Sequence, residues 1–292
     1  MCGRYAASRN PDDLVEEFEV ERVVAAAPLE PDYNVAPTKD VYAVLTRIPR
    51  HPDAQPDANP DSSAEKADTA DTADSADGPV RPVRQLRVLR WGLVPSWAKD
   101  PSIGSRLINA RMETVADKPA FRRAFARRRC LLPADGYYEW YAGDAGADNP
   151  RASRARSGRP AKQPFFIRPS DGGVLAMAGL YEFWRDPAAD PDDPAAWLTT
   201  CTVITTQAVD AVGRIHDRMP MLVEPDRFTQ WLDPTVADTE LVRGLLVPAA
   251  PGRLDAYPVS TAVNNVRNNG PELIEPLPAA GQPVPAEGGA LF

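Results

Sequence analysis

The chain has 292 residues, of which 43% are hydrophobic and 25% are charged, and its formal net charge is -8. This length allows one large domain or two small ones with a full hydrophobic core. No apolar run approaches the roughly 18 residues of a membrane helix, which excludes a helical membrane protein, and the missing basic-then-apolar leader favours the cytoplasm.

Two short helices are predicted from local signals. Asn10 is a suitable N-cap, Pro11 fits a first helical turn, and the two acidic residues that follow favour the positive end of the helix dipole. A second helix is predicted from Asp117, because Phe121 and Phe125 lie four residues apart and leave arginines on the other face.

Strands outnumber helices. Segments rich in β-branched or aromatic residues and bounded by Gly, Pro or Asp are predicted strands at 41–48, 85–91, 131–132, 137–141, 165–167, 174–184 and 199–206, with one more short helix at 226–231. The 32 prolines argue against a bundle of long helices. We therefore expect an α+β fold, a single domain with a curved, mainly antiparallel β-sheet or barrel core flanked by short helices. The similar segments 136–140 and 179–183 are candidates for paired strands of one sheet.

Charge is distributed unevenly along the chain. Residues 51–80 carry eight carboxylates and one lysine, a net charge of -7, and we expect a disordered acidic insertion there. A second, loop insertion is expected at 142–163, and a flexible tail at 276–292. Residues 81–129 carry thirteen cations and three acids, a net charge of +10. This segment predicts a phosphate-binding face, although a solvated helix surface explains it equally well.

Cys2 offers the most specific chemistry. Removal of Met1 would leave an α-amine and a thiol on adjacent carbons, with ordinary pKa values of about 8 and about 8.5. An aldehyde can then form a Schiff base with the amine, and the thiolate can close a thiazolidine ring. The alternative is an accidental cysteine that reacts only through exposure. With Cys130 and Cys201 the cysteine count is odd and no CxxC pair exists, so neither a disulfide framework nor a structural zinc site is expected.

The chain also offers candidates for a general acid or base and for a neutral polar group at the site. His216, between an isoleucine and an aspartate, is a candidate general acid or base. Glu139 stands in an aromatic strand, where apolar surroundings would raise its pKa, but Glu182 has a similar context and the pattern does not separate the two. Asn109 supplies a neutral donor and acceptor, or else is a turn residue.

Two tryptophans flank a Gly/Pro loop that leads into the basic segment. Trp91 and Trp97 would each contribute about 1–3 kcal/mol per base if they stack on single-stranded nucleic acid. They fit a hydrophobic core equally well, and the sequence leaves both interpretations open.

Seven segments, in this order, resemble the motifs of the SOS-response-associated peptidase (SRAP) family, the abasic-site processing proteins. They are Met1–Tyr5, Tyr33–Thr38, Trp91–Trp97, Ile108–Arg111 with Glu113–Thr114, Arg129–Trp140, Ile215–Pro220 and Asn264–Asn268. The resemblance extends to about Glu275 and is interrupted at the two insertions. It implies one SRAP-type domain over residues 1–275.

The resemblance also implies an activity, namely covalent capture of abasic sites in single-stranded DNA during the DNA damage (SOS) response. Cys2 would link to the ring-opened sugar aldehyde, and Asn109 would orient and polarise that sugar. Glu139, favoured over Glu182 by the family match, would handle protons at the α-amine. His216 would act as acid or base in Schiff-base formation, β-elimination or reversal.

The remaining implied roles concern DNA. Seven residues are expected at the DNA-binding surface: Arg4, Arg111 and Arg218 on phosphates, Asn34 lining the site, and Trp91, Pro95 and Trp97 shaping the surface. The resemblance implies no metal and no cofactor, a monomer whose partner is abasic single-stranded DNA, and a cytoplasmic location, at the nucleoid when bound.

Two other functions fit the same residues. A cysteine-type peptidase, with its own Met1 as one candidate substrate, would use Cys2 and His216 for nucleophilic catalysis. A non-catalytic single-strand binding module would use the tryptophans and arginines, with a steep salt dependence and no preference for abasic over intact DNA.

Overall fold

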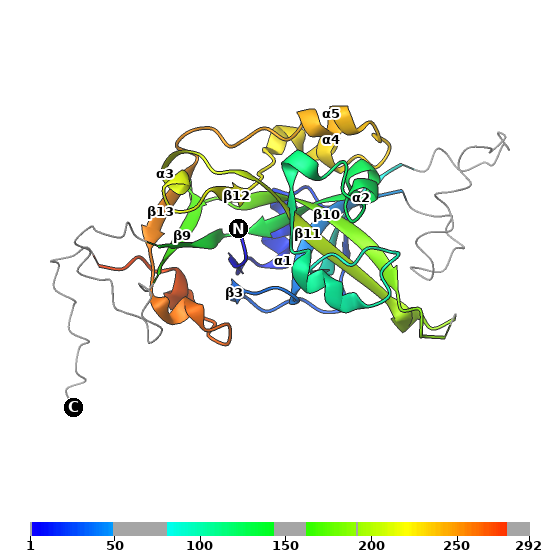
Figure 1. Cartoon of the computed structure of the whole chain (residues 1–292), viewed down its shortest axis with the longest axis horizontal. Coiled ribbons are helices and arrows are strands. Elements are labelled where there is room, and N and C mark those ends of the chain that lie inside the picture. Colours follow the sequence, from blue (N-terminus) through cyan, green and yellow to red (C-terminus); the bar gives the residue numbers. More distant parts are fainter. Residues whose placement is uncertain (1, 49–80, 143–161, 191, 279–292) are drawn as a thin grey trace.

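The computed structural model describes residues 2–48, 81–142, 162–190 and 192–278 (Figure 1). The expected acidic insertion at 51–80 therefore lies outside the described residues, as do most of the expected insertion at 142–163 and most of the tail. Gln163 already belongs to a strand, and the backbone N–H of Leu277 donates to the carbonyl of Pro258 at 2.9 Å, so the fold includes both of these residues.

The predicted α+β fold is confirmed, and its centre is a closed five-stranded barrel. Its strands are β4 (Asp40–Arg47), β5 (Val83–Trp91), β7 (Arg129–Ala134), β10 (Leu175–Arg185) and β11 (Trp197–Gln207). Neighbours in the order β11-β10-β7-β4-β5 pair antiparallel, and parallel pairing of Thr200 with Arg90 and of Cys201 with Trp91 joins β11 to β5. This last pairing closes the ring.

Shorter strands extend the barrel and build a second sheet. β2 (Arg22–Val24), β6 (Asn109–Arg111) and β12 (Arg218–Pro220) attach to β5, β11 and β11 respectively. The second sheet is antiparallel in the order β13 (Leu254–Pro258), β9 (Gln163–Pro169), β8 (Gly136–Tyr141), β1 (Tyr5–Ala7) and β3 (Asp32–Val35). The predicted pairing of segments 136–140 and 179–183 is wrong, because β8 and β10 belong to different sheets.

The helices are short. They are α1 (Pro11–Glu17), α2 (Arg122–Arg127), α3 (Asp210–Gly213), α4 (Phe228–Leu232) and α5 (Thr239–Gly244). The predicted cap is confirmed, since Asn10 Oδ1 accepts the N–H of Asp12 at 3.0 Å. α2 begins five residues later than predicted: Lys118 precedes a proline, which disfavours helical dihedrals, and residues 115–121 form turns and a bend. Phe121 and Phe125 are nevertheless both buried.

Alternation along the barrel strands separates two hydrophobic clusters. On β10, Met177 and Tyr181 point into the barrel with Cys130 and Cys201, whereas Leu180 and its even-numbered neighbours point outward. The outer cluster is covered by apolar side chains of α1, α2, α4 and α5, and the last three helices lie along one side of the molecule in Figure 1. The inner cluster continues into the second sheet, so the barrel interior and the N-terminal strand share one core.

Arg129 joins the barrel to this helical layer. Its side chain is 3% exposed and donates to five backbone carbonyls, those of Phe125, Ala126, Trp231, Asp233 and Val236. Burial lowers the pKa of Arg129 to about 10, against the opposing influence of Asp233. Its expected place on a basic surface is therefore wrong, because the guanidinium ties α2 to the segment after α4.

We expect Arg129→Met to lower the free energy of unfolding by about 3–5 kcal/mol, because five carbonyls lose a charged donor. Urea denaturation monitored by far-UV circular dichroism measures the loss. Arg122→Met is the control, since Arg122 is exposed on α2, the helix that Arg129 anchors, and its loss should stay within about 0.5 kcal/mol. Equal midpoints for the two variants would contradict the anchoring role.

Candidate active site at the N-terminal strand

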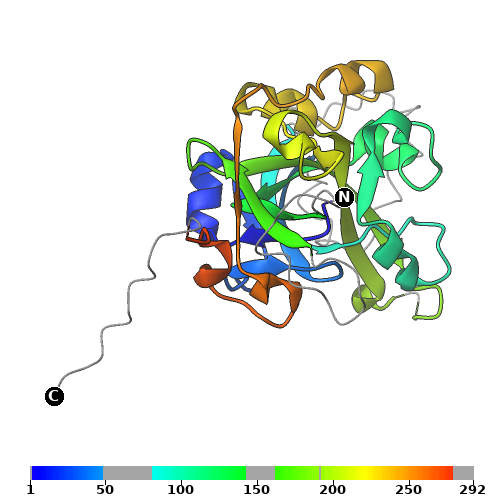
Figure 2. The same cartoon turned by 60° about the vertical axis from the view of Figure 1, so that its left-hand side comes forward.

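Cys2 lies three residues before the start of β1, inside the fold. Figures 1 and 2 both show the dark-blue start of the ribbon among the strands and not at the edge of the molecule. In the chain that carries Met1, Cys2 is fully buried in the inner cluster. Its backbone carbonyl accepts a hydrogen bond of 2.8 Å from Nδ2 of Asn109. Two predicted site residues, 107 positions apart in sequence, therefore touch.

Asn109 is held in place by strand pairing. It begins β6, where it lies opposite Val203 of β11. The alternative of a turn residue is wrong for this asparagine. Its Oδ1 is buried and has no hydrogen-bond partner within the described part of the chain. The Nδ2 group donates to the Cys2 carbonyl, and Oδ1 is left as an acceptor for a further donor at the site.

Glu139 contributes a buried carboxyl on β8. Its side chain is 2% exposed, and it lies on the same face of the strand as Tyr137, two residues earlier. Burial raises the pKa of the Glu139 carboxyl, and a positive charge on His216 opposes that shift. A charge on His216, which belongs to a different part of the fold, therefore acts on the Glu139 carboxyl.

His216 lies between α3 and β12. Its Nδ1 is 3.0 Å from the backbone nitrogen of Arg218 and 2.8 Å from Oδ1 of Asp217. One nitrogen cannot accept from the first and donate to the second at once. Nδ1 accepts the Arg218 N–H when it carries no proton and donates to Asp217 when it carries one.

Burial dominates the chemistry of the Cys2 thiol. Burial raises the pKa of the thiol well above its ordinary range, and the negative charge of Glu139 raises it further, while a backbone hydrogen bond from Arg4 lowers it. The thiol is therefore neutral at physiological pH in this state. A reaction at sulfur needs a proton acceptor, and Glu139 and His216 are the nearby candidates.

Arg4 and Asn34 have structural partners. Nη1 of Arg4 donates to Oδ1 of Asn34 at 2.7 Å and to the carbonyl of Val263 at 3.0 Å. Asn34 is fully buried, and its Nδ2 donates to the carbonyls of Val263, Asn265 and Asn268. The Asn34 amide ties β3 to the segment 263–268, and its expected place lining the site stays a prediction.

Arg218 and Arg111 differ in their surroundings. Arg218 donates to both carboxylate oxygens of Glu113, at 2.6 and 3.0 Å, and to the carbonyl of Thr205. To bind a phosphate it would have to exchange Glu113 for the ligand. Arg111, at the end of β6, is exposed, two residues from Asn109.

The structure separates the tryptophan pair. Trp91 is fully buried, packs edge-on against Tyr5 and donates from Nε1 to the carbonyl of Ile108 at 3.0 Å. Pro95 is buried as well. These two side chains therefore belong to the interior, whereas Trp97 is 60% exposed, and the expected part of all three in shaping a DNA surface stays a prediction.

The basic segment 81–129 does not form one surface. Arg129 is buried, Arg128 pairs with Glu182, and Arg84 bonds to the carbonyl of Phe18 and to Glu19. Glu182, the other glutamate that the sequence offered as a catalytic candidate, therefore forms an ion pair with an arginine. The exposed cations of this segment are Arg81, which pairs with Glu21, and Lys99, Arg106, Arg111, Lys118, Arg122, Arg123 and Arg127.

Sequence reasoning missed two buried tyrosines beside Cys2. Tyr5 of β1 lies directly opposite Tyr137 of β8, and both belong to the inner cluster with Cys2. Their hydroxyls are buried and lack a hydrogen-bond partner among the described residues. Both tyrosines stand inside the quoted motifs, but their shared face becomes apparent only when β1 and β8 are paired.

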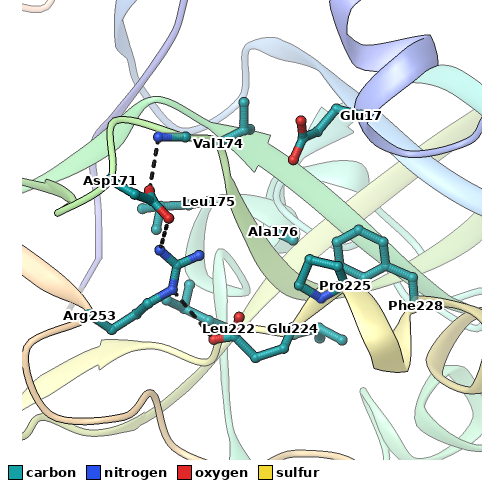
Figure 3. A pocket seen from close by; sticks show the side chains of 12 residues that line it. Glu17, Asp171, Val174, Leu175, Ala176, Leu222, Glu224, Pro225, Phe228 and Arg253 are labelled. Atoms are coloured by element: carbon teal, nitrogen blue, oxygen red, sulfur yellow. Dashed lines mark hydrogen bonds and ion pairs between the residues drawn. The ribbon is translucent and has the colours of Figure 1, made fainter.

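A cavity of about 150 Å³ lies elsewhere, on the outer side of β10 (Figure 3). Arg253 bonds there to Asp171 at 2.6 Å and approaches Glu224 at 3.7 Å, above an apolar floor that includes Phe228. None of the residues that the sequence marked for catalysis or DNA binding lines it.

Neither a metal centre nor a membrane span is found where the structure is described. Within 2–48, 81–142, 162–190 and 192–278, no three His, Cys, Asp or Glu side chains gather as metal ligands. Among the helices of these same ranges, none has the length and apolar character to cross a bilayer.

The fold and the candidate site together define a small α+β protein in which a buried cysteine, Cys2, is held against Asn109 just before the first strand. A family model described as SOS response associated peptidase (SRAP) matches residues 1–266, and the chain belongs to this family. The resemblance stated from the motifs is confirmed.

Two named relatives are similar to this chain over almost its whole length. The chain is 34% identical over 275 residues to the abasic site processing protein YoqW of Bacillus subtilis (strain 168), covering 94% of this chain and 99% of that protein. It is 28% identical over 287 residues to the abasic site processing protein YedK of Escherichia coli (strain K12), covering 95% and 100%. A solved structure from Bacteroides thetaiotaomicron has the same fold, with a TM-score of 0.66, 20% identity, and coverage of 94% of this chain and 100% of that one.

Proposed function

We propose that this protein processes abasic sites in single-stranded DNA by forming a covalent crosslink through Cys2 after Met1 is removed. The observation that carries the proposal is the contact between Cys2 and Asn109 beside the buried carboxyl of Glu139. The names of the relatives, abasic site processing proteins, support the substrate class.

The chemistry uses the α-amine and then the thiol. The free amine of Cys2 attacks the C1′ aldehyde of the ring-opened sugar, and loss of water gives a Schiff base. The Cys2 S–H then adds across the C=N bond, the sulfur to carbon and the proton to nitrogen, and a five-membered thiazolidine closes without change of oxidation state. Glu139 accepts a proton from the α-ammonium, and His216 delivers one to the departing water.

The surroundings support binding of a single strand at this point. Asn109 Oδ1 is an unpartnered acceptor suited to a sugar hydroxyl. Arg111 and Trp97 are exposed and provide a phosphate contact and a stacking surface. Arg4 and Arg218 already have protein partners, so we assign them to positioning of the site in place of direct phosphate binding.

The peptidase alternative needs the thiol as a nucleophile on a carbonyl carbon, which requires a thiolate. Burial and Glu139 raise the pKa of the Cys2 thiol and disfavour it in the chain that carries Met1. Thiazolidine closure needs a weaker sulfur nucleophile than attack on a peptide carbonyl does. The amine reacts first, and the imine that it forms is an activated electrophile. We therefore rank crosslinking above general peptidase activity. The one peptide cleavage that crosslinking requires is the removal of Met1.

Two substrates test the proposal. We expect the Met1-processed protein, verified by intact mass, to form a heat-stable adduct on a denaturing gel with abasic single-stranded DNA and none with the intact strand. Fluorescence anisotropy at two salt concentrations should give salt-dependent binding to both strands. Equal, fully reversible binding to both strands without an adduct would instead identify a non-catalytic single-strand binding module.

A further inference from the structure

We infer that Glu113 is a positioning residue: its carboxylate holds the Arg218 side chain and thereby fixes the segment of His216 relative to the strand that carries Asn109. The role in crosslinking rests on the proposed function, whereas the positioning itself can be tested without DNA. Glu113 belongs to one of the quoted motifs but has no part in the chemistry proposed above.

Two short strands on opposite edges of β11 carry the residues concerned. β6 pairs with one edge and β12 with the other, and Thr205 of β11 takes part in both pairings. β6 begins at Asn109 and leads into the 3-10 helix Met112–Thr114, which contains Glu113. β12 begins at Arg218, two residues after His216. β11 therefore lies between the segment of Asn109 and the segment of His216.

The Arg218 guanidinium spans β11 and joins these two segments. Nη1 donates to Oε1 of Glu113 at 2.6 Å, and Nη2 donates to Oε2 at 3.0 Å. Nη2 also donates to the carbonyl of Thr205 at 2.6 Å. Two parallel hydrogen bonds between a guanidinium and a carboxylate fix direction as well as distance. The bonds from Arg218 lower the pKa of the Glu113 carboxyl, so the pair stays charged at physiological pH.

The held arginine orients His216. The backbone N–H of Arg218 donates to Nδ1 of His216 at 3.0 Å. The neighbouring carbonyl of Asp217 accepts the N–H of Ala208 at 2.9 Å, which ties the same turn to the end of β11. A backbone N–H can hold an imidazole ring only while its own residue is held. Glu113 therefore acts on His216 through Arg218.

The ion pair matters more to this segment than to the whole fold. The Glu113 side chain is 52% exposed, and exposed ion pairs stabilise a protein only weakly. β6 and β12 have three residues each, and short elements of this kind open locally at a lower free energy than global unfolding. Loss of the carboxylate should therefore loosen the His216 segment and leave the melting temperature close to that of the wild type.

Hydrogen exchange of the DNA-free protein, read by mass spectrometry, tests the positioning. We expect Glu113→Gln to speed exchange of the peptide 214–219 about tenfold or more, because hydrogen bonds between charged groups are lost. Glu21→Gln is the matched control. It breaks another glutamate–arginine ion pair, with Arg81 at 2.5 Å beside β2, and should leave this peptide unchanged.

Crosslinking gives the second readout. With the Met1-processed protein and saturating abasic single-stranded DNA, Glu113→Gln should react about tenfold more slowly, because the acid–base group is misplaced. The DNA concentration that gives half the maximal rate should stay within about threefold of the wild type, since the substitution removes no group that binds DNA. In an Arg218→Gln background the further substitution Glu113→Gln should have no effect, because Glu113 acts through that arginine.

Two results would overturn the inference. One is unchanged exchange of the peptide 214–219 in Glu113→Gln. The other is tighter DNA binding with faster crosslinking in this variant, which would show that Glu113 competes with a phosphate for Arg218. Failure of the wild type to crosslink would overturn the proposed function alone, because the exchange experiment contains no DNA.

Discussion

A chain in which alanine replaces Cys2 is expected to give no heat-stable adduct with abasic single-stranded DNA, a loss of more than about 10³-fold. The variant keeps an α-amine and can still form a Schiff base, but nothing closes the ring, and the imine hydrolyses on heating. Borohydride should therefore trap an adduct in the variant that disappears without reductant. The measurement is a denaturing gel with and without borohydride, after intact mass confirms removal of Met1.

Two further variants test whether the adduct depends on the Cys2 thiol and not on another cysteine or on a hydroxyl at position 2. Cys201→Ala removes a thiol from the same buried cluster, and we expect it to crosslink like the wild type once allowance is made for lower stability. Cys2→Ser keeps an amine and a poorer nucleophile and should resemble Cys2→Ala. A heat-stable adduct of wild-type yield in Cys2→Ala would eliminate the thiazolidine mechanism.

Local patterns were sufficient to predict the elements of the fold. The Asn10 cap and the seven predicted strands each depend on residues within one short window, and the structure confirms them with shifted ends. The barrel closure was beyond such reasoning, because pairing of β5 with β11 joins residues about a hundred positions apart and involves only two residue pairs. The start of α2 was missed because the aspartate signal competes with the conformation imposed before Pro119.

For the candidate site too, the sequence identified the reactive residues but did not predict which side chains are buried. Residue chemistry pointed to Cys2, Asn109 and His216, and the family resemblance selected Glu139 over Glu182. The structure brings the four residues into one region from four separate segments. Their catalytic roles stay predictions. Sequence could not separate Trp91 from Trp97, because the choice between core and surface depends on strands that cover one of them. The structural partners of Asn34 were beyond sequence reasoning for a similar reason, since they are backbone carbonyls of a segment more than 200 residues away.

Glutamine at position 139 should slow crosslinking by about 10²–10⁴-fold, because the amide keeps the shape of the carboxyl and loses its ability to accept a proton. Burial raises the pKa of Glu139, so the wild-type rate should rise with pH through that raised value, and this limb of the profile should be absent in the variant. Glu182→Gln is the control. It removes the other buried carboxyl, the partner of Arg128, and should lower stability while leaving the rate within a few-fold. Equal rates for Glu139→Gln and the wild type would remove Glu139 from the mechanism.

Stability gives an independent test of the same carboxyl. A pKa raised in the folded state means that folding favours the protonated acid. Below pH 4.5, the ordinary value, the carboxyl is protonated in both states and Glu139→Gln should match the wild type in free energy of unfolding. As pH rises through the folded pKa, the wild type has to bury a charge and loses stability that the glutamine variant keeps. Urea denaturation from pH 4 to pH 8 should therefore show Glu139→Gln becoming the more stable protein while it is the slower crosslinker, the combination expected of a residue retained for its chemistry at a cost in folding.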